Sequence, residues 1–205
     1  MWSGHKTCWH VGPVLLLLIG LIVPSAQAQT QTQTQTGGTT ENWTSQLVGL
    51  ETPPELDLPA LRQEALARVK AKTDGAPLKR APIATQLLNL PKIIVEIKFD
   101  EDTPIVRPES YRILGRIADT LTHPSLLSHK FLIVGHSAAV GRRDYNLTLS
   151  QRRADAIRDI LVTTFKISPK RLQAIGLGEE QLLDAAHPAA ATNQRIQIAT
   201  VARMP

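Results

Sequence analysis

The chain has 205 residues, and 23 basic against 18 acidic side chains give it a formal net charge of +5. Such a modest excess is typical of a soluble surface and specifies no anionic partner. The single cysteine, Cys8, precedes a long apolar stretch instead of ending it. Once a leader containing Cys8 is removed, the chain has no disulfide, no thiolate metal site and no lipid-modified cysteine.

The first 28 residues have the layout of a secretory signal peptide. Lys6 precedes an apolar stretch at residues 13–23, and the small-residue pattern Ala26-Gln27-Ala28 follows, so we expect cleavage after Ala28. The apolar stretch has eleven residues, whereas a helix needs about 20 to cross a bilayer. Retention of this segment as a loose anchor is the alternative. Export argues against a nucleic-acid partner.

The stretch that follows the leader is expected to link it to a folded domain. Residues 29–56 contain an alternating Gln and Thr tract and the pair Pro53-Pro54, a composition that predicts a disordered tether. Within residues 57–91, Leu61, Ala65 and Val69 recur at four-residue spacing. This spacing predicts one short amphipathic helix, and the remainder of the segment is expected to be a linker.

Residues 92–203 have the pattern of an α/β unit that is large enough for one hydrophobic core. Val95, Ile97 and Phe99 alternate with charged residues and predict a strand with one wetter face. An apolar stripe at residues 113–121 then predicts a helix that packs on the sheet.

The second half of this unit continues the alternation of strands and helices. Residues 131–134 are uninterrupted apolar and predict a central strand that is covered on both faces. A long helix is expected from about residue 143 to residue 165, followed by strands at residues 172–175 and 195–201. The predicted order of elements is therefore β-α-β-α-β-β, with no internal repeat.

Residues 135–154 keep every spacing of a longer motif, G-H/Y-T/S-D-x-x-G-x-x-x-Y-N-x-x-L-S-x-x-R-A, but Ala138 occupies its acidic position. Three further segments are similar to other motifs of the same protein family, at residues 99–108, 171–179 and 193–198. Together these pieces resemble the OmpA-like peptidoglycan-binding domain over residues 92–203. The resemblance implies an α/β (α+β) fold of two layers, with the helices on one face of a mixed sheet.

The resemblance also implies a ligand, the diaminopimelate side arm of the peptidoglycan stem peptide, which is a zwitterion. In that family a carboxylate accepts from the ligand ammonium, and an arginine fork grips the ligand carboxylate. Arg153 matches the arginine, but Ala138 removes the carboxylate, a loss of about 1.5–3 kcal/mol for a hydrogen bond to a charged group. The loop acids that are candidates to replace it are Asp100, Glu101, Asp102 and Asp144. The implied ligand-binding residues are Arg153, Asn146, Ser137, Asp102, Thr103 and Arg195.

Several of these positions also have a purely structural interpretation. Arg153 is in a helix and can cover the sheet edge. Asn146 can cap or pack the turn-to-helix junction, because its side chain competes for local backbone groups. Arg195 is equally compatible with a surface position, and a loop acid such as Asp102 is commonly solvated or capping.

The function expected from these observations is non-enzymatic binding of peptidoglycan in the envelope of a Gram-negative bacterium. We expect the protein in the periplasm, in association with the outer membrane or cell wall, with other envelope proteins as further candidate partners. No cofactor is indicated, and the histidines lack the paired spacing of metal ligands. The main alternative is a degenerate domain that has kept the fold and become a protein-interaction module.

A remote alternative is a serine hydrolase. Residues 135–139 resemble a G-x-S-x-G nucleophile elbow, with Ala139 in the last glycine position. Ser137 would then be the nucleophile, and Asp184 and His187 are the later candidates for its relay. Their separation by only three residues is awkward for two groups of one relay, and the domain is too small for the large sheet of that class.

Overall fold

A mixed four-stranded sheet forms the centre of the part of the chain that the structure describes. Its strands are β1 (Lys92–Val95), β2 (His129–His136), β3 (Leu172–Gly178) and β4 (Ile196–Arg203), in the spatial order β1-β4-β2-β3. Strand β4 is antiparallel to both β1 and β2, whereas β3 is parallel to β2. Strand β2 is buried along nearly its whole length, as the apolar run at residues 131–134 predicts.

The computed structural model describes residues 38–50, 52, 54, 56–71 and 80–204, all within one of the two units of the chain. The predicted signal peptide and the Gln and Thr tract lie outside the described residues. Helices α3 (Tyr111–Leu121) and α4 (Arg143–Thr163) connect β1 to β2 and β2 to β3. The predicted order β-α-β-α-β-β is therefore confirmed. The short 3-10 helices are η2 (Thr85–Leu87), η3 (Pro108–Ser110), η4 (Pro124–Leu126), η5 (Pro169–Arg171) and η6 (Ala191–Asn193).

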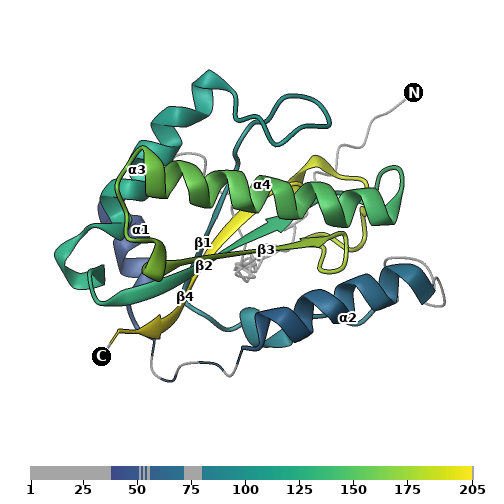
Figure 1. Cartoon of the computed structure of the whole chain (residues 1–205), viewed down its shortest axis with the longest axis horizontal. Helices are drawn as coiled ribbons and strands as arrows, with labels where there is room; N and C mark the ends of the chain where they lie inside the picture. Colours follow the sequence, from purple (N-terminus) through teal and green to yellow (C-terminus); the bar gives the residue numbers. More distant parts are fainter. Residues whose placement is uncertain (1–37, 51, 53, 55, 72–79, 205) are drawn as a thin grey trace, which may run out of the picture. The chain divides into compact units, whose positions relative to one another are not determined.

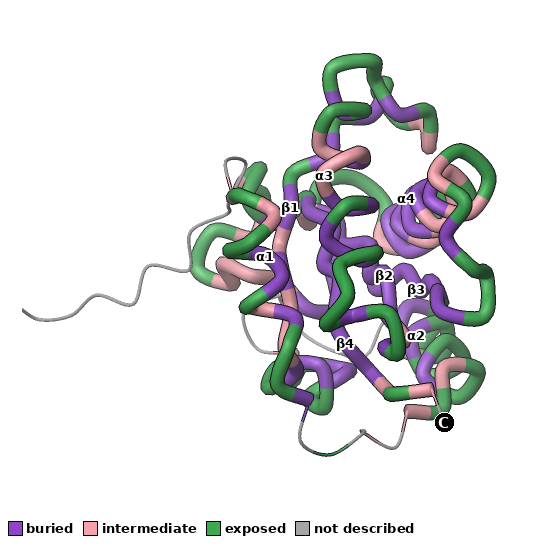
Figure 2. The backbone as a smooth tube through the Cα atoms, turned by 90° about the vertical axis from the view of Figure 1, so that its left-hand side faces the viewer, coloured by how far each residue is buried: buried purple, intermediate pink, exposed green. Residues whose placement is uncertain are grey.

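Both faces of the sheet are covered, by helices from different parts of the chain (Figure 1). Helices α3 and α4 pack on one face, as expected for the domain, and α1 (Thr40–Leu47) joins them there. Helix α2 (Leu58–Ala71) covers the opposite face and adds a third layer that precedes the domain in sequence. Figure 2 shows the buried central strands between α4 and α2. None of the helices in the described ranges is long and apolar enough to cross a membrane.

Helix α1 corrects the expectation that residues 29–56 form a disordered tether throughout. Thr39 accepts a hydrogen bond from the backbone N–H of Asn42 and caps the helix. Trp43 is 1% exposed in the core beside α3, and the carbonyl of Leu47 accepts from the Thr200 hydroxyl on β4 at 2.7 Å. Apolar burial, which a polar flanking sequence conceals, therefore orders this segment.

The first strand is shorter than its alternating pattern predicts. Strand β1 ends at Val95, and the alternating residues Ile97 and Phe99 are buried although they lie beyond it. Phe99 forms an isolated bridge with Val106, which closes the loop between β1 and α3. The strand prediction was wrong after Val95 because these residues fold into this loop instead of continuing along β4.

Two glycines let α4 approach the sheet closely. A Cβ atom on Gly135 of β2 would lie 2.2 Å from the carbonyl oxygen of Ser150, and one on Gly176 of β3 would lie 2.1 Å from the nitrogen of Gln151. Any side chain at either position would push α4 away from the strands. The Gln151 side chain also accepts from the Gly176 N–H at 2.8 Å. The start of α4 is thereby fixed over the carboxyl ends of β2 and β3.

Candidate functional site

A cavity of about 530 Å³ lies where the carboxyl end of β2 meets the start of α4. Three segments enclose it: the loop between β1 and α3, the turn and helix that follow β2, and the loop before β4. Four of the six predicted site residues line this cavity, namely Asp102, Ser137, Asn146 and Arg153. Thr103 belongs to the loop between β1 and α3 that encloses the cavity but is not one of the lining residues, and Arg195 does not line the cavity either.

The guanidinium of Arg153 is fixed at the cavity by one hydrogen bond and one aromatic contact. Its side chain is in α4, the residue is 6% exposed, and Nε donates to the Thr103 carbonyl at 3.0 Å. The guanidinium carbon lies 4.8 Å from the centre of the Phe99 ring, which also lines the cavity. Among the described residues, nothing accepts a hydrogen bond from Nη1 or Nη2. The two Nη nitrogens of the guanidinium therefore remain available to donate hydrogen bonds to a ligand.

Burial lowers the pKa of Arg153, while the nearby carboxylate of Asp102 opposes that shift. An arginine remains charged through the physiological range because its ordinary pKa is far above it. The cavity therefore holds a permanent cation in a partly desolvated setting, where a charge-assisted bond to an anionic group is stronger than at an open surface.

The loop between β1 and α3 presents Asp102 to this cation. Asp102 has a positive φ of 53°, and its carbonyl accepts from the Tyr145 hydroxyl at 2.9 Å. The Thr103 hydroxyl donates to the Asp100 carbonyl at 3.2 Å and accepts from the Ile105 N–H at 3.1 Å. Thr103 thus shapes the loop with its side chain and supports Arg153 with its carbonyl.

The structure separates the candidate replacement acids for Ala138. Ala138 itself lines the cavity, and so do Glu101 and Asp102. Asp100 instead pairs with Arg107 at 3.1 Å, and Asp144 pairs with Arg142 at an exposed position. Neither Asp100 nor Asp144 lines the cavity.

Ser137 contributes a buried hydroxyl to the cavity. Its backbone N–H donates to the Gly178 carbonyl at 2.9 Å, which fixes the residue at the end of β2. The residue is 6% exposed, and within the described part of the chain its Oγ has no hydrogen-bond partner. A buried hydroxyl without a protein partner calls for an explanation, and Ser137 is one of the residues that line the cavity.

Asn146 combines a place in the cavity wall with a structural role. Its amide group donates to the carbonyls of Ala138 at 3.3 Å and Val140 at 3.0 Å, and to Oε2 of Glu179 at 2.8 Å. These bonds hold the turn after β2 against the first turns of α4. The structural interpretation of Asn146 is therefore the one that its contacts support.

Arg195 lies away from the cavity lining, and the ligand contact expected for it has no support in the structure. Its Nη1 donates to the Asn193 carbonyl at 3.2 Å and its Nη2 to the Gln181 carbonyl at 3.1 Å. Burial lowers the pKa of Arg195 to about 10. Arg195 therefore joins the loop before β4 to the loop after β3, where the sequence alone left site and surface equally open.

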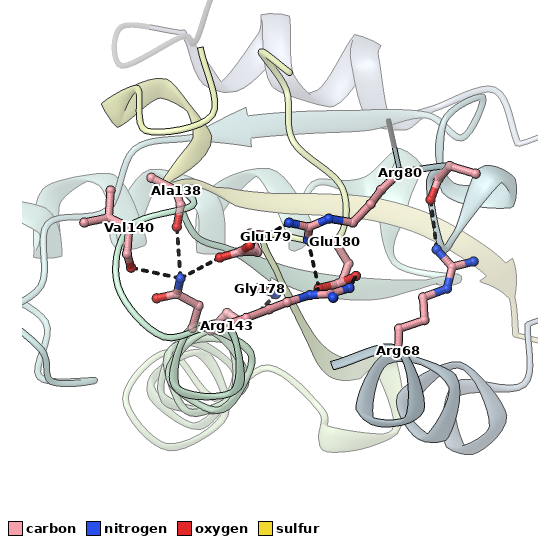
Figure 3. A network of polar contacts seen from close by, with 11 residues as sticks. Arg68, Arg80, Ala138, Val140, Arg143, Gly178, Glu179 and Glu180 are labelled. Atoms are coloured by element: carbon pink, nitrogen blue, oxygen red, sulfur yellow. Dashed lines mark hydrogen bonds and ion pairs between the residues drawn. The ribbon is translucent and has the colours of Figure 1, made fainter. Parts of the chain in front are cut away.

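A buried ion-pair network beside the cavity was missed by the sequence analysis (Figure 3). Arg80 contacts Glu179 at 3.0 Å and Glu180 at 3.5 Å, and Arg143 donates through Nε to Glu180 at 2.6 Å. Two adjacent glutamates at the end of an apolar strand were a visible signal, because buried carboxylates require cations. Their cations were not visible, since Arg80 and Arg143 come from distant segments.

The geometry does not assemble the relay of a serine hydrolase. His187 Nδ1 lies 2.8 Å from Asp184 on an exposed loop, so that pair exists. In the described residues, however, Ser137 Oγ has no hydrogen-bond partner, and Ser137 is not among the residues with positive φ. A nucleophile elbow needs a strained turn and a base within reach of the serine.

The fold and the cavity define a small α+β domain with a pocket at one end of its sheet, and comparison with known proteins relates it to a family. Residues 98–195 match the model of the OmpA family, so the chain carries an OmpA-family domain. The chain is 30% identical over 125 residues to outer membrane porin F of Pseudomonas fluorescens, covering 60% of this chain and 36% of that protein. It is 35% identical over 85 residues to the peptidoglycan-associated lipoprotein of Mesorhizobium japonicum, covering 42% of this chain and 49% of that protein.

The match to these relatives thus spans about a third to a half of their length. Among solved structures, the crystal structure of the peptidoglycan-associated lipoprotein from Burkholderia pseudomallei is 28% identical, with a TM-score of 0.42. That likeness covers 52% of this chain and 88% of the other.

Proposed function

We propose that this protein binds peptidoglycan non-covalently through the cavity of its OmpA-family domain. The relatives named peptidoglycan-associated lipoprotein support this proposal, since they are 28–35% identical to this chain over 85 and 109 residues. The cavity supports it independently, because a buried cation, a nearby carboxylate and a buried hydroxyl suit a ligand that carries both charges.

The single observation that carries the proposal is the fork of Arg153. Nε donates to the Thr103 carbonyl, and the guanidinium lies over the Phe99 ring. Nη1 and Nη2 have no acceptor among the described residues. A planar pair of donors matches the two oxygens of a carboxylate. We assign this fork to the side-arm carboxylate of diaminopimelate.

The ligand ammonium requires a carboxylate, and Asp102 is our candidate. Ala138 cannot supply one, whereas Asp102 lines the same cavity and acts electrostatically on Arg153. A carboxylate and a guanidinium at one cavity form a two-point site for a zwitterion. Ser137 adds a neutral hydrogen-bond donor and acceptor at the same wall.

The second candidate function is a protein-interaction module, and the alanine at position 138 favours it. If Asp102 does not bind the ammonium, the cavity has only half of the two-point grip, a loss worth about 10- to 100-fold in affinity. The domain would then keep its fold without useful affinity for the wall. Only the peptidoglycan-binding candidate predicts that affinity depends on the side-arm carboxylate of the stem peptide.

We propose further that the protein is exported and acts without catalysis on the periplasmic side of the envelope. The name of porin F as an outer membrane protein supports this location. The leader at residues 1–28 supports export, and the sequence of the mature N-terminus, read by mass spectrometry, tests the expected cleavage after Ala28.

The binding proposal is tested by calorimetric titration of the purified protein with two soluble stem peptides. One contains diaminopimelate, and the other contains lysine, which has the ammonium but lacks the side-arm carboxylate. We expect the diaminopimelate peptide to bind about 10- to 100-fold more tightly, because only it engages the Arg153 fork. Equal affinity, or no binding of either peptide, would reject this site and favour the interaction module.

A further inference from the structure

Arg80 belongs to a segment that precedes the family match at residues 98–195, yet its side chain is buried against the domain. The side chain is 8% exposed, and its two Nη groups contact Glu179 and Glu180 in the loop after β3. The Ala81 carbonyl accepts from Arg68 of α2 at 2.9 Å, and the Ala84 N–H donates to Gln181 at 3.2 Å. Residues 80–84 are thereby docked on the loop that carries both glutamates.

Glu179 connects Arg80 to the cavity wall (Figure 3). Its Oε1 accepts from Arg80 at 3.0 Å, and its Oε2 accepts from Asn146 at 2.8 Å. The same Asn146 amide holds the carbonyls of Ala138 and Val140, and all three of these residues line the cavity. An unbroken series of contacts therefore runs from the preceding segment to the turn that forms one wall of the site.

The charge balance of this cluster explains why Arg80 matters. Among the described residues, two buried carboxylates, Glu179 and Glu180, contact two guanidiniums, Arg80 and Arg143. Removing Arg80 takes the cation away from the buried carboxylate of Glu179, a change that the molecule relieves by taking up a proton or by moving the carboxylate toward water. Protonation weakens the hydrogen bond from Asn146 to Glu179, because a charged acceptor is stronger than a neutral one. Movement of the carboxylate toward water weakens the same bond by separating its partners.

We infer that Arg80 and Glu179 are positioning residues for the cavity, acting through Asn146 on the turn at residues 138–140. This inference rests on the proposed function, since it deepens the account of the same site. It assigns the segment before the family domain a role in ligand affinity. The binding unit then extends beyond the part of the chain that the family model matches.

The test compares Arg80→Gln with the matched control Arg158→Gln in the purified full chain. Arg158 also contacts two acids, Asp155 and Asp159, but on the outer part of α4. Two readouts are measured: affinity for the diaminopimelate stem peptide, and hydrogen exchange of the Ala139 amide, which donates to the Pro188 carbonyl. The second readout follows the turn itself and needs no ligand.

We expect Arg80→Gln to weaken peptide binding by about 2- to 30-fold, the range for network substitutions outside a site. We also expect faster exchange at Ala139, partial rescue of both readouts by Arg80→Lys, and no change in Arg158→Gln. Glu179→Gln should act in the same direction, and its effect should not add to that of Arg80→Gln because both act through one contact.

Unchanged Ala139 exchange in Arg80→Gln, or effects of Arg80→Gln and Glu179→Gln that add fully, would overturn the inference. If Arg80→Gln does not fold, Glu179→Gln and Arg80→Lys carry the same two readouts. Failure of the wild-type protein to bind the peptide would instead reject the proposed function, and Ala139 exchange would still decide whether Arg80 positions the turn.

Discussion

The guanidinium carbon of Arg153 lies 4.8 Å from the centre of the Phe99 ring. Phe99 closes the loop between β1 and α3, and Arg153 is part of α4, so this contact joins two walls of the cavity. A cation over an aromatic face contributes about 0.5–2 kcal/mol, more when desolvated. Arg153 is therefore a structural residue and a candidate ligand-binding residue at once.

Arg153→Ala should lower both wall binding and stability. The side chain is buried and bonded to the Thr103 carbonyl, so its removal costs more stability than removal of a surface arginine. We expect a loss of about 1–3 kcal/mol in the free energy of unfolding, measured by urea denaturation.

Arg153→Lys separates the two roles of this residue. Lysine keeps a cation and an alkyl stem over Phe99, so we expect most of the stability to remain. It lacks the planar fork, so affinity for the diaminopimelate peptide should fall about tenfold or more. Wild-type affinity in this variant would show that a single positive charge is sufficient and that the fork has no role.

Asp102→Asn should weaken binding of the same peptide by about 10- to 100-fold, since the ammonium loses its charged acceptor. Asp100→Asn is the matched control, because Asp100 is in the same loop but pairs with Arg107 and does not line the cavity. Adding Ala138→Asp to Asp102→Asn should restore affinity. Equal affinities for wild type and Asp102→Asn would mean that Asp102 is only a loop residue.

Stability should fall in mild acid because of His136. Burial, with the nearby charge of Arg195, lowers the pKa of His136 well below its ordinary value. The unfolded chain, with a histidine pKa of about 6.5, then binds more protons than the folded chain below that pH. The contribution of His136 is complete above about pH 6.5 and is lost as the pH falls, by up to about 1.4 kcal/mol per pH unit.

Urea denaturation of wild type and His136→Gln between pH 7.5 and about 5 measures this effect, since glutamine does not titrate. We expect the difference between their unfolding free energies to shrink as the pH falls. Parallel curves would show that another group causes any acid sensitivity.

Trp43→Ala should destabilise the domain by about 3–5 kcal/mol, as expected for removal of a fully buried tryptophan. The side chain is 1% exposed and packs in the core that α1 shares with α3 and the sheet. Val48→Ala, at the exposed end of the same helix, should change stability by no more than about 0.5 kcal/mol. Thermal melting of both variants provides the comparison, and an unaffected Trp43→Ala would show that α1 adds nothing to the fold.

The order of strands and helices in the domain could be predicted because each element carries its own periodicity. The apolar stripe of α3 and the uninterrupted run in β2 are local signals that depend on no distant segment. Helix α1 could not be predicted in this way. Its few apolar residues follow a polar tract, and the α3 surface that buries them is distant in sequence.

The candidate site was predictable in part, for a similar reason. Arg153 and Asp102 were found through motif spacing, and the structure places both at the cavity. The partners of Glu179 were not predictable, because Arg80 and Asn146 reach it from segments far apart in the chain. Arg195 is the opposite case. Its motif position made it a candidate, but the sequence could not reveal that its Nη groups already donate to backbone carbonyls.

Co-sedimentation of the purified, folded protein with isolated sacculi that contain diaminopimelate tests most directly whether the domain binds the cell wall. We predict that the wild-type protein sediments with the sacculi, that the free diaminopimelate stem peptide competes it off, and that a clearly smaller fraction of folded Arg153→Lys sediments at the same protein concentration. Folded wild-type protein that stays in the supernatant, or sediments regardless of the competing peptide, would show that the domain does not bind peptidoglycan through this cavity.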